Sequence, residues 1–206
     1  MDKSQEFDLM IIGGGAAGLS CALVIGSGLE KSYATNKKAG IILHQKASHL
    51  NSALLNNVFG ISPGVKGGDL LKQGKDHLTQ LYPKVEQISG EKVKEVREVE
   101  DSFKIITNKA EYFSKTIVVA IGYTSPFRIS GLEDYLIPHK KAKLSKNRVQ
   151  LKNDDHLVKP GLYVAGTLAG WRSQYSIATG SGAAVATDIL TEWNDGEHTK
   201  VHDKLT

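Results

Sequence analysis

The chain has 206 residues, a formal net charge of +4 at pH 7, 23% charged residues and one cysteine. This length suits one sizeable domain, the charge is too small to indicate a nucleic-acid partner, and a lone cysteine excludes an intrachain disulfide framework. No apolar run is long enough to cross a membrane, and the polar N-terminal residues do not form a signal peptide. We therefore expect a cytoplasmic protein with neither a membrane nor a nucleic-acid partner.

The first element along the chain is an apolar strand, Phe7 to Ile12, that turns directly into a helix. The turn has the spacing G-x-G-x-x-G, with its glycines at Gly13, Gly15 and Gly18. In this motif the first glycine permits the turn, the second lets a pyrophosphate approach the backbone, and the third lets the helix pack on the strand. The free N–H groups at the helix start would face the phosphates: those of Gly15, Ala16 and Ala17. The pattern predicts a dinucleotide site.

The next elements alternate between helix and strand. We expect the first helix over about 19–26 and a second strand over 41–45. A turn-rich stretch, 56–68, leads into a helix that begins at Asp69, its expected N-cap, and ends at about residue 81, before a proline. A third short strand is expected over 85–88.

From residue 92 to about 116 the apolar period changes to two, which predicts an antiparallel meander of three strands. The last of these strands continues into a fourth buried parallel strand over 116–122. A connection over about 123–149, which contains the basic segment 139–148, leads to a fifth buried strand, 161–166. The sequence predicts an α/β fold with a doubly wound, parallel five-stranded sheet and an inserted three-stranded meander.

The last element is a long helix, expected over about 173–193, with one apolar face. Ligands in open parallel sheets lie at the carboxyl ends of the strands. We therefore expect the Gly-rich turn, the ends of the fourth and fifth strands, and the start of this helix to share one site.

Several of these motifs, in this order, resemble the FAD domain of the thioredoxin reductase family, which are FAD-dependent pyridine nucleotide-disulfide oxidoreductases. The motifs are the Gly-rich loop at 13–18, the stretch from Asn57 to Leu71, Val93 in the meander, the strand end at 118–122, Pro160–Thr167, and 173–182 at the last helix. The resemblance covers almost all of the chain from Phe7 to about Gly196. It implies an FAD cofactor held by Gly13, Gly14, Gly15, Ala16, Ala17, His44, Gln45, Asn57, Val93, Ala120, Gly122, Gly166, Thr167, Ser173, Gln174 and Tyr175.

The departures from the family pattern limit the expected chemistry. The connection over 123–149 is too short for the family's NADPH domain, so we expect residues 1–206 to form a single FAD-binding domain. No C-x-x-C motif is present, and Cys21 on the first helix is expected to be a buried structural residue. Thr167 replaces the aspartate that contacts the ribityl chain. His44 or Gln45 stands where a ribose-binding acid is expected, which weakens an NAD site more than an FAD site.

The resemblance implies an oxidoreductase whose flavin carries the redox chemistry. The N-terminus of the last helix near Gln174 would stabilise the negative charge of reduced flavin. The electron donor would be a partner protein or a small-molecule reductant such as NAD(P)H, and the family's habit implies a homodimer. Two alternatives stay open: a non-catalytic FAD-binding module or subunit that needs a partner electron donor, and a plain NAD-binding module.

Other chemistry-bearing residues give weaker signals, and the catalytic residues stay unknown. The seven histidines show no metal-ligand spacing, and the serines lack a G-x-S-x-G elbow, so neither a metal site nor a hydrolase triad is expected. Tyr123, Trp171 and Tyr175 would either stack on the flavin or fill space. The basic segment from Lys140 to Arg148 is either a solvated loop or a docking patch for an acidic electron-transfer protein.

Overall fold

A computed structural model describes residues 6–43, 48–123 and 126–202. Its main sheet contains five parallel strands in the spatial order β12–β8–β1–β2–β5. Their bounds are Glu6–Ile12 for β1, Ala39–Ile42 for β2, Val85–Ile88 for β5, Glu111–Val119 for β8 and Leu162–Val164 for β12. The predicted parallel five-stranded sheet is confirmed.

The antiparallel part of the sheet is the predicted meander. It consists of β6 (Val93–Val99), β7 (Ser102–Thr107) and the first half of β8. β8 continues without a break from the meander into the parallel sheet, where Thr116 to Val119 pair with β1. A short strand, β11 (Leu157–Lys159), adds an antiparallel edge to β12.

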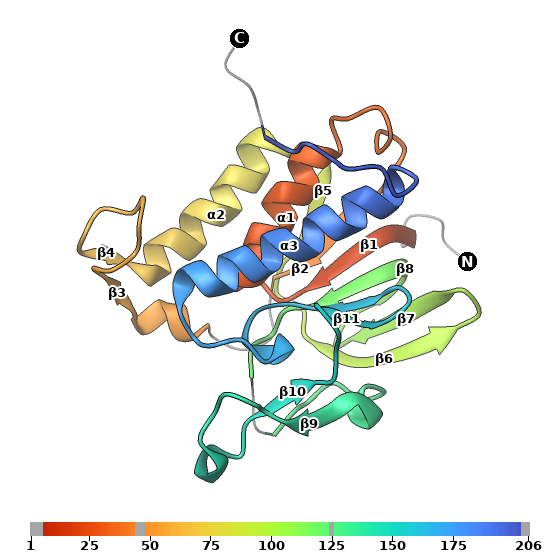
Figure 1. The fold of residues 1–206 in the computed structure, drawn as a ribbon. Coiled ribbons are helices and arrows are strands. Elements are labelled where there is room, and N and C mark those ends of the chain that lie inside the picture. Colours follow the sequence, from red (N-terminus) through yellow and green to blue (C-terminus); the bar gives the residue numbers. More distant parts are fainter. Residues whose placement is uncertain (1–5, 44–47, 124–125, 203–206) are drawn as a thin grey trace.

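The sheet separates a layer of helices from the meander (Figure 1). The helices α1 (Ala16–Gly28), α2 (Gly67–Leu81) and α3 (Tyr175–Trp193) cover one face, and the meander covers the other. Strand β1 is apolar at every position from Leu9 on: Leu9 and Ile11 pack against the helices, whereas Met10 and Ile12 pack against the meander. Because successive strand side chains point to opposite faces, a strand buried on both sides has no polar alternation.

Two expected helix boundaries are corrected. Helix α2 begins at Gly67 with Lys66 as its N-cap, so the prediction that Asp69 caps it was wrong. Asp69 instead lies in the first turn, where its negative carboxylate interacts favourably with the positive end of the helix dipole. Helix α3 begins at Tyr175, two residues later than expected, because the Gln174 side chain caps it by accepting a hydrogen bond from Ile177 N at 3.0 Å.

Several short elements lie where the sequence predicts loops. Strands β3 (Leu54–Leu55) and β4 (Val65–Lys66) pair as one small hairpin, and β9 (Leu136–Pro138) and β10 (Val149–Leu151) pair as another. The described residues also form 3-10 turns: η2 (His49–Ser52), η3 (Glu133–Tyr135), η4 (Leu144–Lys146) and η5 (Gly166–Ala169). Strands of two or three residues are too short to show a period. The β9–β10 hairpin is the main structure in the connection at 123–149.

Cys21 lies on α1 and is fully buried among the side chains between the helices and the sheet. Burial raises the pKa of its thiol far above the usual value, so the thiolate form is disfavoured. Among the described residues, the helices are too short or too polar to span a bilayer.

Candidate functional site

A cavity of about 700 Å³ opens at the carboxyl ends of β1, β8 and β12. Its wall brings together segments far apart in the sequence: the Gly-rich loop, the ends of two later strands and the start of α3. Thirteen of the sixteen expected cofactor residues line it: Gly13, Gly14, Gly15, Ala16, Ala17, Asn57, Ala120, Gly122, Gly166, Thr167, Ser173, Gln174 and Tyr175. A volume of this size lies within the usual range for ligand sites.

Three of the expected residues do not line this wall. His44 and Gln45 lie outside the described residues. Val93 begins β6 and is fully buried in the layer between the sheet and the meander. Its proposed backbone contact with the cofactor stays a prediction.

The Gly-rich loop has the geometry that its spacing predicts. Gly13 has a φ of +120°, and a Cβ there would lie 2.5 Å from the Ala120 carbonyl oxygen. A Cβ on Gly18 would lie 1.8 Å from the Gly13 carbonyl oxygen, so only glycine lets the helix pack this close. A Cβ on Gly15 would meet only Ser48 Oγ, at 3.7 Å. At Gly15 the missing side chain therefore leaves free space in the cavity wall.

Two helix N-termini meet the cavity. Helix α1 has Gly15 as its N-cap, and no side chain of the described residues caps it, which leaves the N–H groups of its first turn for a ligand. The longer helix α3 begins at the same wall with Gln174 and Tyr175. The positive ends of both helix dipoles therefore favour an anionic ligand.

Glycine also permits a close crossing of these two helices. A Cβ on Gly182 of α3 would lie 2.0 Å from the Ala17 carbonyl oxygen of α1. Ser20 Oγ adds a hydrogen bond of 2.8 Å to the Thr179 carbonyl oxygen across the same crossing. The crossing fixes both helix N-termini relative to one another at the cavity.

The sequence reasoning missed two lysines of α2, Lys72 and Lys75, which line the cavity. His49 on η2 lines it as well. The two lysines had a readable signal, since Gly68, Leu71, Lys72 and Lys75 follow the helical spacing i, i+3, i+4, i+7 and line one wall together. His49 lies on a single short turn, which has no such periodic signal.

Thr167 is the junction between the cavity and the connection at 123–149. Its Oγ1 accepts a hydrogen bond from Tyr123 N at 3.0 Å. Its carbonyl oxygen lies 2.9 Å from His139 Nε2. Lys141 N donates to His139 Nδ1 at 3.1 Å, so Nδ1 is the acceptor and Nε2 carries the proton that is donated to Thr167. The first residue of the connection, Tyr123, and His139 further along it are thereby attached to one residue of the cavity wall.

The ring of Tyr123 contacts one guanidinium group and two histidine rings. Arg148 Cζ lies 4.0 Å from the centroid of its ring, and His139 meets the ring edge-on at 5.3 Å. The His49 ring lies 6.3 Å away at an interplanar angle of 26°. Tyr123 and His49 line the cavity, and Arg148 and His139 do not.

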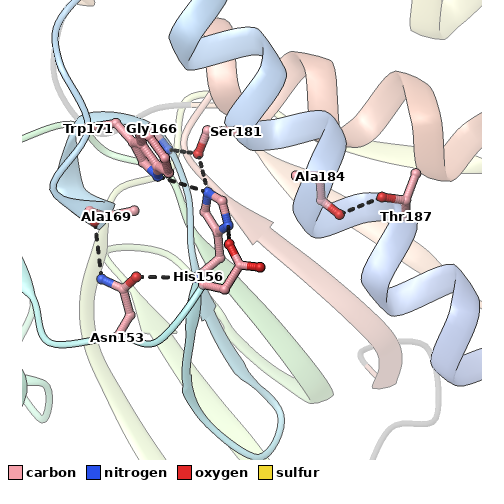
Figure 2. A network of polar contacts seen from close by, with 9 residues as sticks. Asn153, His156, Gly166, Ala169, Trp171, Ser181, Ala184 and Thr187 are labelled. Carbon is pink, nitrogen blue, oxygen red and sulfur yellow. Dashed lines mark hydrogen bonds and ion pairs between the residues drawn. The ribbon is translucent and has the colours of Figure 1, made fainter.

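A second polar network, around His156, reaches the cavity wall at Gly166 (Figure 2). Ser181 Oγ accepts a hydrogen bond from Gly166 N at 2.7 Å and lies 2.8 Å from His156 Nε2. Trp171 Nε1 also donates to His156 Nε2, at 3.1 Å. An indole N–H only donates, so Nε2 accepts and the proton of the neutral ring lies on Nδ1, facing Asp155 at 3.5 Å. Ser181 is buried, which gives this Ser-His-Asp set a structural role.

The cavity fits a dinucleotide with a diphosphate. The free space at Gly15, the uncapped start of α1 and the adjacent start of α3 supply what such an anion requires. The described residues contain no group of three or more His, Cys, Asp or Glu that could hold a metal ion. The fold and the site define an α/β dinucleotide-binding protein.

Residues 7–167 match the pyridine nucleotide-disulphide oxidoreductase family. The match covers more than half of the chain, so the chain belongs to this family of oxidoreductases. The resemblance to thioredoxin reductase-like flavoproteins read from the sequence motifs is confirmed.

Curated relatives support this assignment. A ferredoxin–NADP reductase of Lactococcus lactis subsp. cremoris (strain SK11) is 30% identical over 119 residues, which cover 57% of this chain and 36% of the relative. Ferredoxin–NADP reductase 1 of Bacillus cytotoxicus is 29% identical over 161 residues, or 77% of this chain and 42% of the relative. The chain thus spans less than half the length of these relatives.

Solved structures share the fold. A thioredoxin reductase from Gloeobacter violaceus superposes with a TM-score of 0.70 at 15% identity, covering 98% of this chain and 99% of that one. A ferredoxin-flavin thioredoxin reductase from Clostridium acetobutylicum gives a TM-score of 0.67 at 20% identity, with coverages of 95% and 98%. At such low identity the likeness establishes the fold alone.

Proposed function

We propose that this chain is a single FAD-binding domain that acts as an FAD-dependent oxidoreductase. The observation that carries the proposal is the cavity at the strand ends, where the Gly-rich loop and the starts of α1 and α3 converge. FAD, when bound, would supply the electron-accepting ring that the side chains of the cavity wall do not provide.

The protein groups have separate tasks in this proposal. The N–H groups at Gly15, Ala16 and Ala17 bind the diphosphate, and the space at Gly15 lets it approach the backbone. The start of α3 at Gln174 places positive dipole charge at the cavity wall, where it stabilises negative charge on a reduced ring. Thr167 keeps a hydroxyl proton to donate, because its Oγ1 is the acceptor of the Tyr123 N–H.

We further propose that a partner protein donates electrons, and that it docks on the basic segment from Lys140 to Arg148. This segment is attached to the cavity wall through His139 and Thr167. Lys141 Nζ lies 4.4 Å from the Trp171 ring centroid, which extends the basic surface by a partly exposed aromatic side chain. Such a surface fits an acidic partner. Ferredoxin, which appears in the names of the curated relatives, is the partner to test first.

The docking proposal has a direct kinetic test. The rate of flavin reduction by reduced ferredoxin is measured at low and high ionic strength. Electrostatic steering predicts a steep fall with salt, and reversal of two charges in Lys143→Glu/Lys146→Glu reproduces that fall at low salt. A small-molecule reductant is the donor instead if the rate with ferredoxin does not respond to salt and NAD(P)H alone reduces the flavin.

A cytoplasmic homodimer remains our proposal for the assembly. Its support is a set of exposed apolar side chains around the cavity end of the helical layer: Leu54, Phe59 and Ile177. Phe59 is fully exposed in the turn between β3 and β4. Light scattering coupled to size-exclusion chromatography measures the mass; a monomer at micromolar concentration contradicts the dimer.

The central experiment is an absorbance spectrum of the purified protein, followed by titration of the apoprotein with FAD. We expect a flavin spectrum and stoichiometric uptake. Gly15→Ala places a methyl group in the phosphate cradle and should weaken FAD binding at least about 10-fold, because the diphosphate loses its close approach. Gly180→Ala on α3 is the matched control, since a Cβ there meets nothing within 4 Å. It should bind FAD as the wild type does.

The outcomes separate the proposed functions. Uptake of FAD followed by reduction with a physiological donor supports the oxidoreductase. Uptake without reduction by ferredoxin or NAD(P)H favours a non-catalytic FAD-binding module. A protein that takes up no FAD contradicts the proposal and leaves a nicotinamide-dinucleotide module to test.

A further inference from the structure

We propose that the contact between His156 and Trp171 is a pH-sensitive switch: neutral His156 holds the Trp171 indole, and a second proton on the His156 ring releases it. Neither residue lines the cavity, so the inference goes beyond the proposed function. Trp171 lies between η5 and α3, in the loop that carries Ser173 and Gln174 to the cavity wall. Its release would loosen that loop.

The first observation is that two donors share His156 Nε2 (Figure 2). Trp171 Nε1 donates to it at 3.1 Å, and Ser181 Oγ, which accepts from Gly166 N, lies 2.8 Å from it. An indole N–H only donates, so Nε2 must carry a free lone pair. A proton on Nε2 would place two donors face to face. The bond to Trp171 therefore exists only while His156 is neutral.

Ser181 can adapt to a charged His156, whereas Trp171 cannot. A hydroxyl oxygen has two lone pairs, so Ser181 Oγ can accept from His156 Nε2 as well as from Gly166 N. Its own proton can then turn to the carbonyl four residues earlier in α3, a bond that serines in helices make. Trp171 is partly exposed, so water can accept its N–H once it leaves His156. Protonation thus releases Trp171 and keeps the Gly166 bond.

The backbone at His156 is an independent sign of a specific role. Asp154 and Leu157 exchange two backbone hydrogen bonds, of 2.9 and 2.8 Å, around the two-residue turn formed by Asp155 and His156. Both turn residues have a positive φ, +39° and +76°. Such a turn prefers Asn-Gly, because glycine adopts a positive φ without strain. A histidine in this place costs backbone strain, and strain of this kind is typical of functional residues.

Three carboxylates around His156 favour a second proton on its ring. Asp155 Oδ1 lies 3.5 Å from His156 Nδ1, which has no hydrogen-bond partner among the described residues. Asp188 on α3 belongs to the same group: burial and then the Asp155 charge raise the pKa of Asp188, and a charged His156 lowers it. Glu192, one turn further along α3, adds a third negative charge.

Two kinds of group oppose the second proton. The donors of Trp171 and Ser181 both require the free lone pair of His156 Nε2. Lys141 Nζ, 4.4 Å from the Trp171 ring centroid, and the exposed Arg172 next to Trp171 in the chain contribute positive charge. Histidine is the side chain that changes its charge between about pH 5 and about pH 8. The opposing groups therefore set the switch within that range.

Heteronuclear NMR tests the switch directly, because the protein has only two tryptophans. The wild type is titrated from about pH 8 to about pH 5, and Trp171→Phe identifies the indole N–H signal of Trp171. We expect this signal to shift and its protection against hydrogen exchange to fall about 2- to 10-fold, the equivalent of one net hydrogen bond. The Gly166 amide should keep its protection. Trp193 supplies the second indole signal as an internal reference.

Two variants of His156 should fix the signal at either end of the titration. His156→Gln places an amide oxygen near the position of Nε2 and does not titrate, so Trp171 should stay bonded throughout. His156→Asn suits the positive φ but ends at the position of Nδ1, so Trp171 should be free throughout. His77→Gln on the exposed side of α2 is the matched control and should titrate as the wild type does.

The effect on the cavity rests on the FAD binding proposed above and has its own readout. The FAD dissociation constant of the apoprotein is measured at about pH 7.5 and about pH 5.5. The wild type should bind about 2- to 10-fold more weakly at the lower pH, whereas His156→Gln should bind equally at both. The same pH dependence in both proteins would show that the release of Trp171 does not reach the cavity.

Two results would overturn the switch itself. A Trp171 signal that stays constant in the wild type shows that the indole is not released. A signal that moves with pH in His156→Gln as it does in the wild type assigns the titration to another group. If His156→Gln does not fold, His156→Asn decides in the same way. A wild type that binds no FAD at either pH contradicts the proposed function, and the Trp171 signal still decides the switch.

Discussion

His139 and Thr167 connect two parts of the molecule that lie 28 residues apart. His139 Nε2 donates to the Thr167 carbonyl oxygen at 2.9 Å, and the His139 side chain is buried. Thr167 lines the cavity, and His139 directly follows β9. The hydrogen bond attaches the β9–β10 hairpin to the wall where the cofactor would lie.

We expect His139→Ala to destabilise the protein by about 1–3 kcal/mol, because the Thr167 carbonyl loses its donor. The hairpin should also become a preferred site of proteolysis, since one of its anchors is lost. Urea unfolding and limited trypsin digestion measure both effects. His77→Ala on the exposed side of α2 is the control and should change neither. Equal stability of His139→Ala and the wild type would contradict the anchoring role.

The helix crossing at Gly182 should not tolerate a methyl group. Gly182→Ala is expected to cost about 1–3 kcal/mol or more, since its Cβ would lie 2.0 Å from the Ala17 carbonyl oxygen. Gly180→Ala, two residues earlier, should stabilise the protein by up to about 1 kcal/mol through helix propensity. Thermal unfolding of both variants checks the opposite signs. If both variants shift the thermal unfolding midpoint in the same direction, the two helices pack less closely at Gly182 than the structure shows.

The stability of the network around His156 should depend on Ser181. Ser181→Ala removes the acceptor of Gly166 N and one partner of His156, and we expect a loss of about 1–3 kcal/mol in unfolding free energy. Thr187→Ala is the matched control (Figure 2). Its hydroxyl only bonds to the Ala184 carbonyl on the same helix, so the change should stay within about 0.5 kcal/mol. Urea midpoints of the two variants measure the difference.

Tyr112 should make stability sensitive to alkaline pH. Burial, and then the hydrogen bond to Glu91, raise the pKa of Tyr112 from 10.0 to about 12. The protonated form is favoured in the folded state, so this stabilisation is complete below pH 10 and is lost as the pH rises toward 12. Tyr112→Phe should therefore show a shallower fall in unfolding free energy over this range. Equal slopes in the two proteins would show that Tyr112 does not contribute.

The parts of the fold that were predicted correctly have local sequence signals. Strand β1 and the G-x-G-x-x-G turn occupy contiguous residues, and a side chain at Gly18 would clash with the carbonyl oxygen of Gly13, five residues earlier. The alternation expected of the meander holds in β7, where every second residue from Phe103 is buried, whereas the apolar residues of β6, Val93, Val96 and Val99, are three apart. The N-cap of α2 was misplaced because the observed N-cap is Lys66, whose side chain makes no capping hydrogen bond and gives no N-cap signal in the sequence.

The sequence by itself determined the dinucleotide loop, the parallel sheet and the chain segments that reach its carboxyl end, because periodicity and glycine geometry act over a few residues. Only the tertiary structure decided that His139 donates to Thr167, that Arg148 covers Tyr123, and that the His49 ring lies against the same ring. These contacts join short turns and three-residue strands that have no period of their own. Their partners are set by how the hairpin packs against the sheet, which no local pattern encodes.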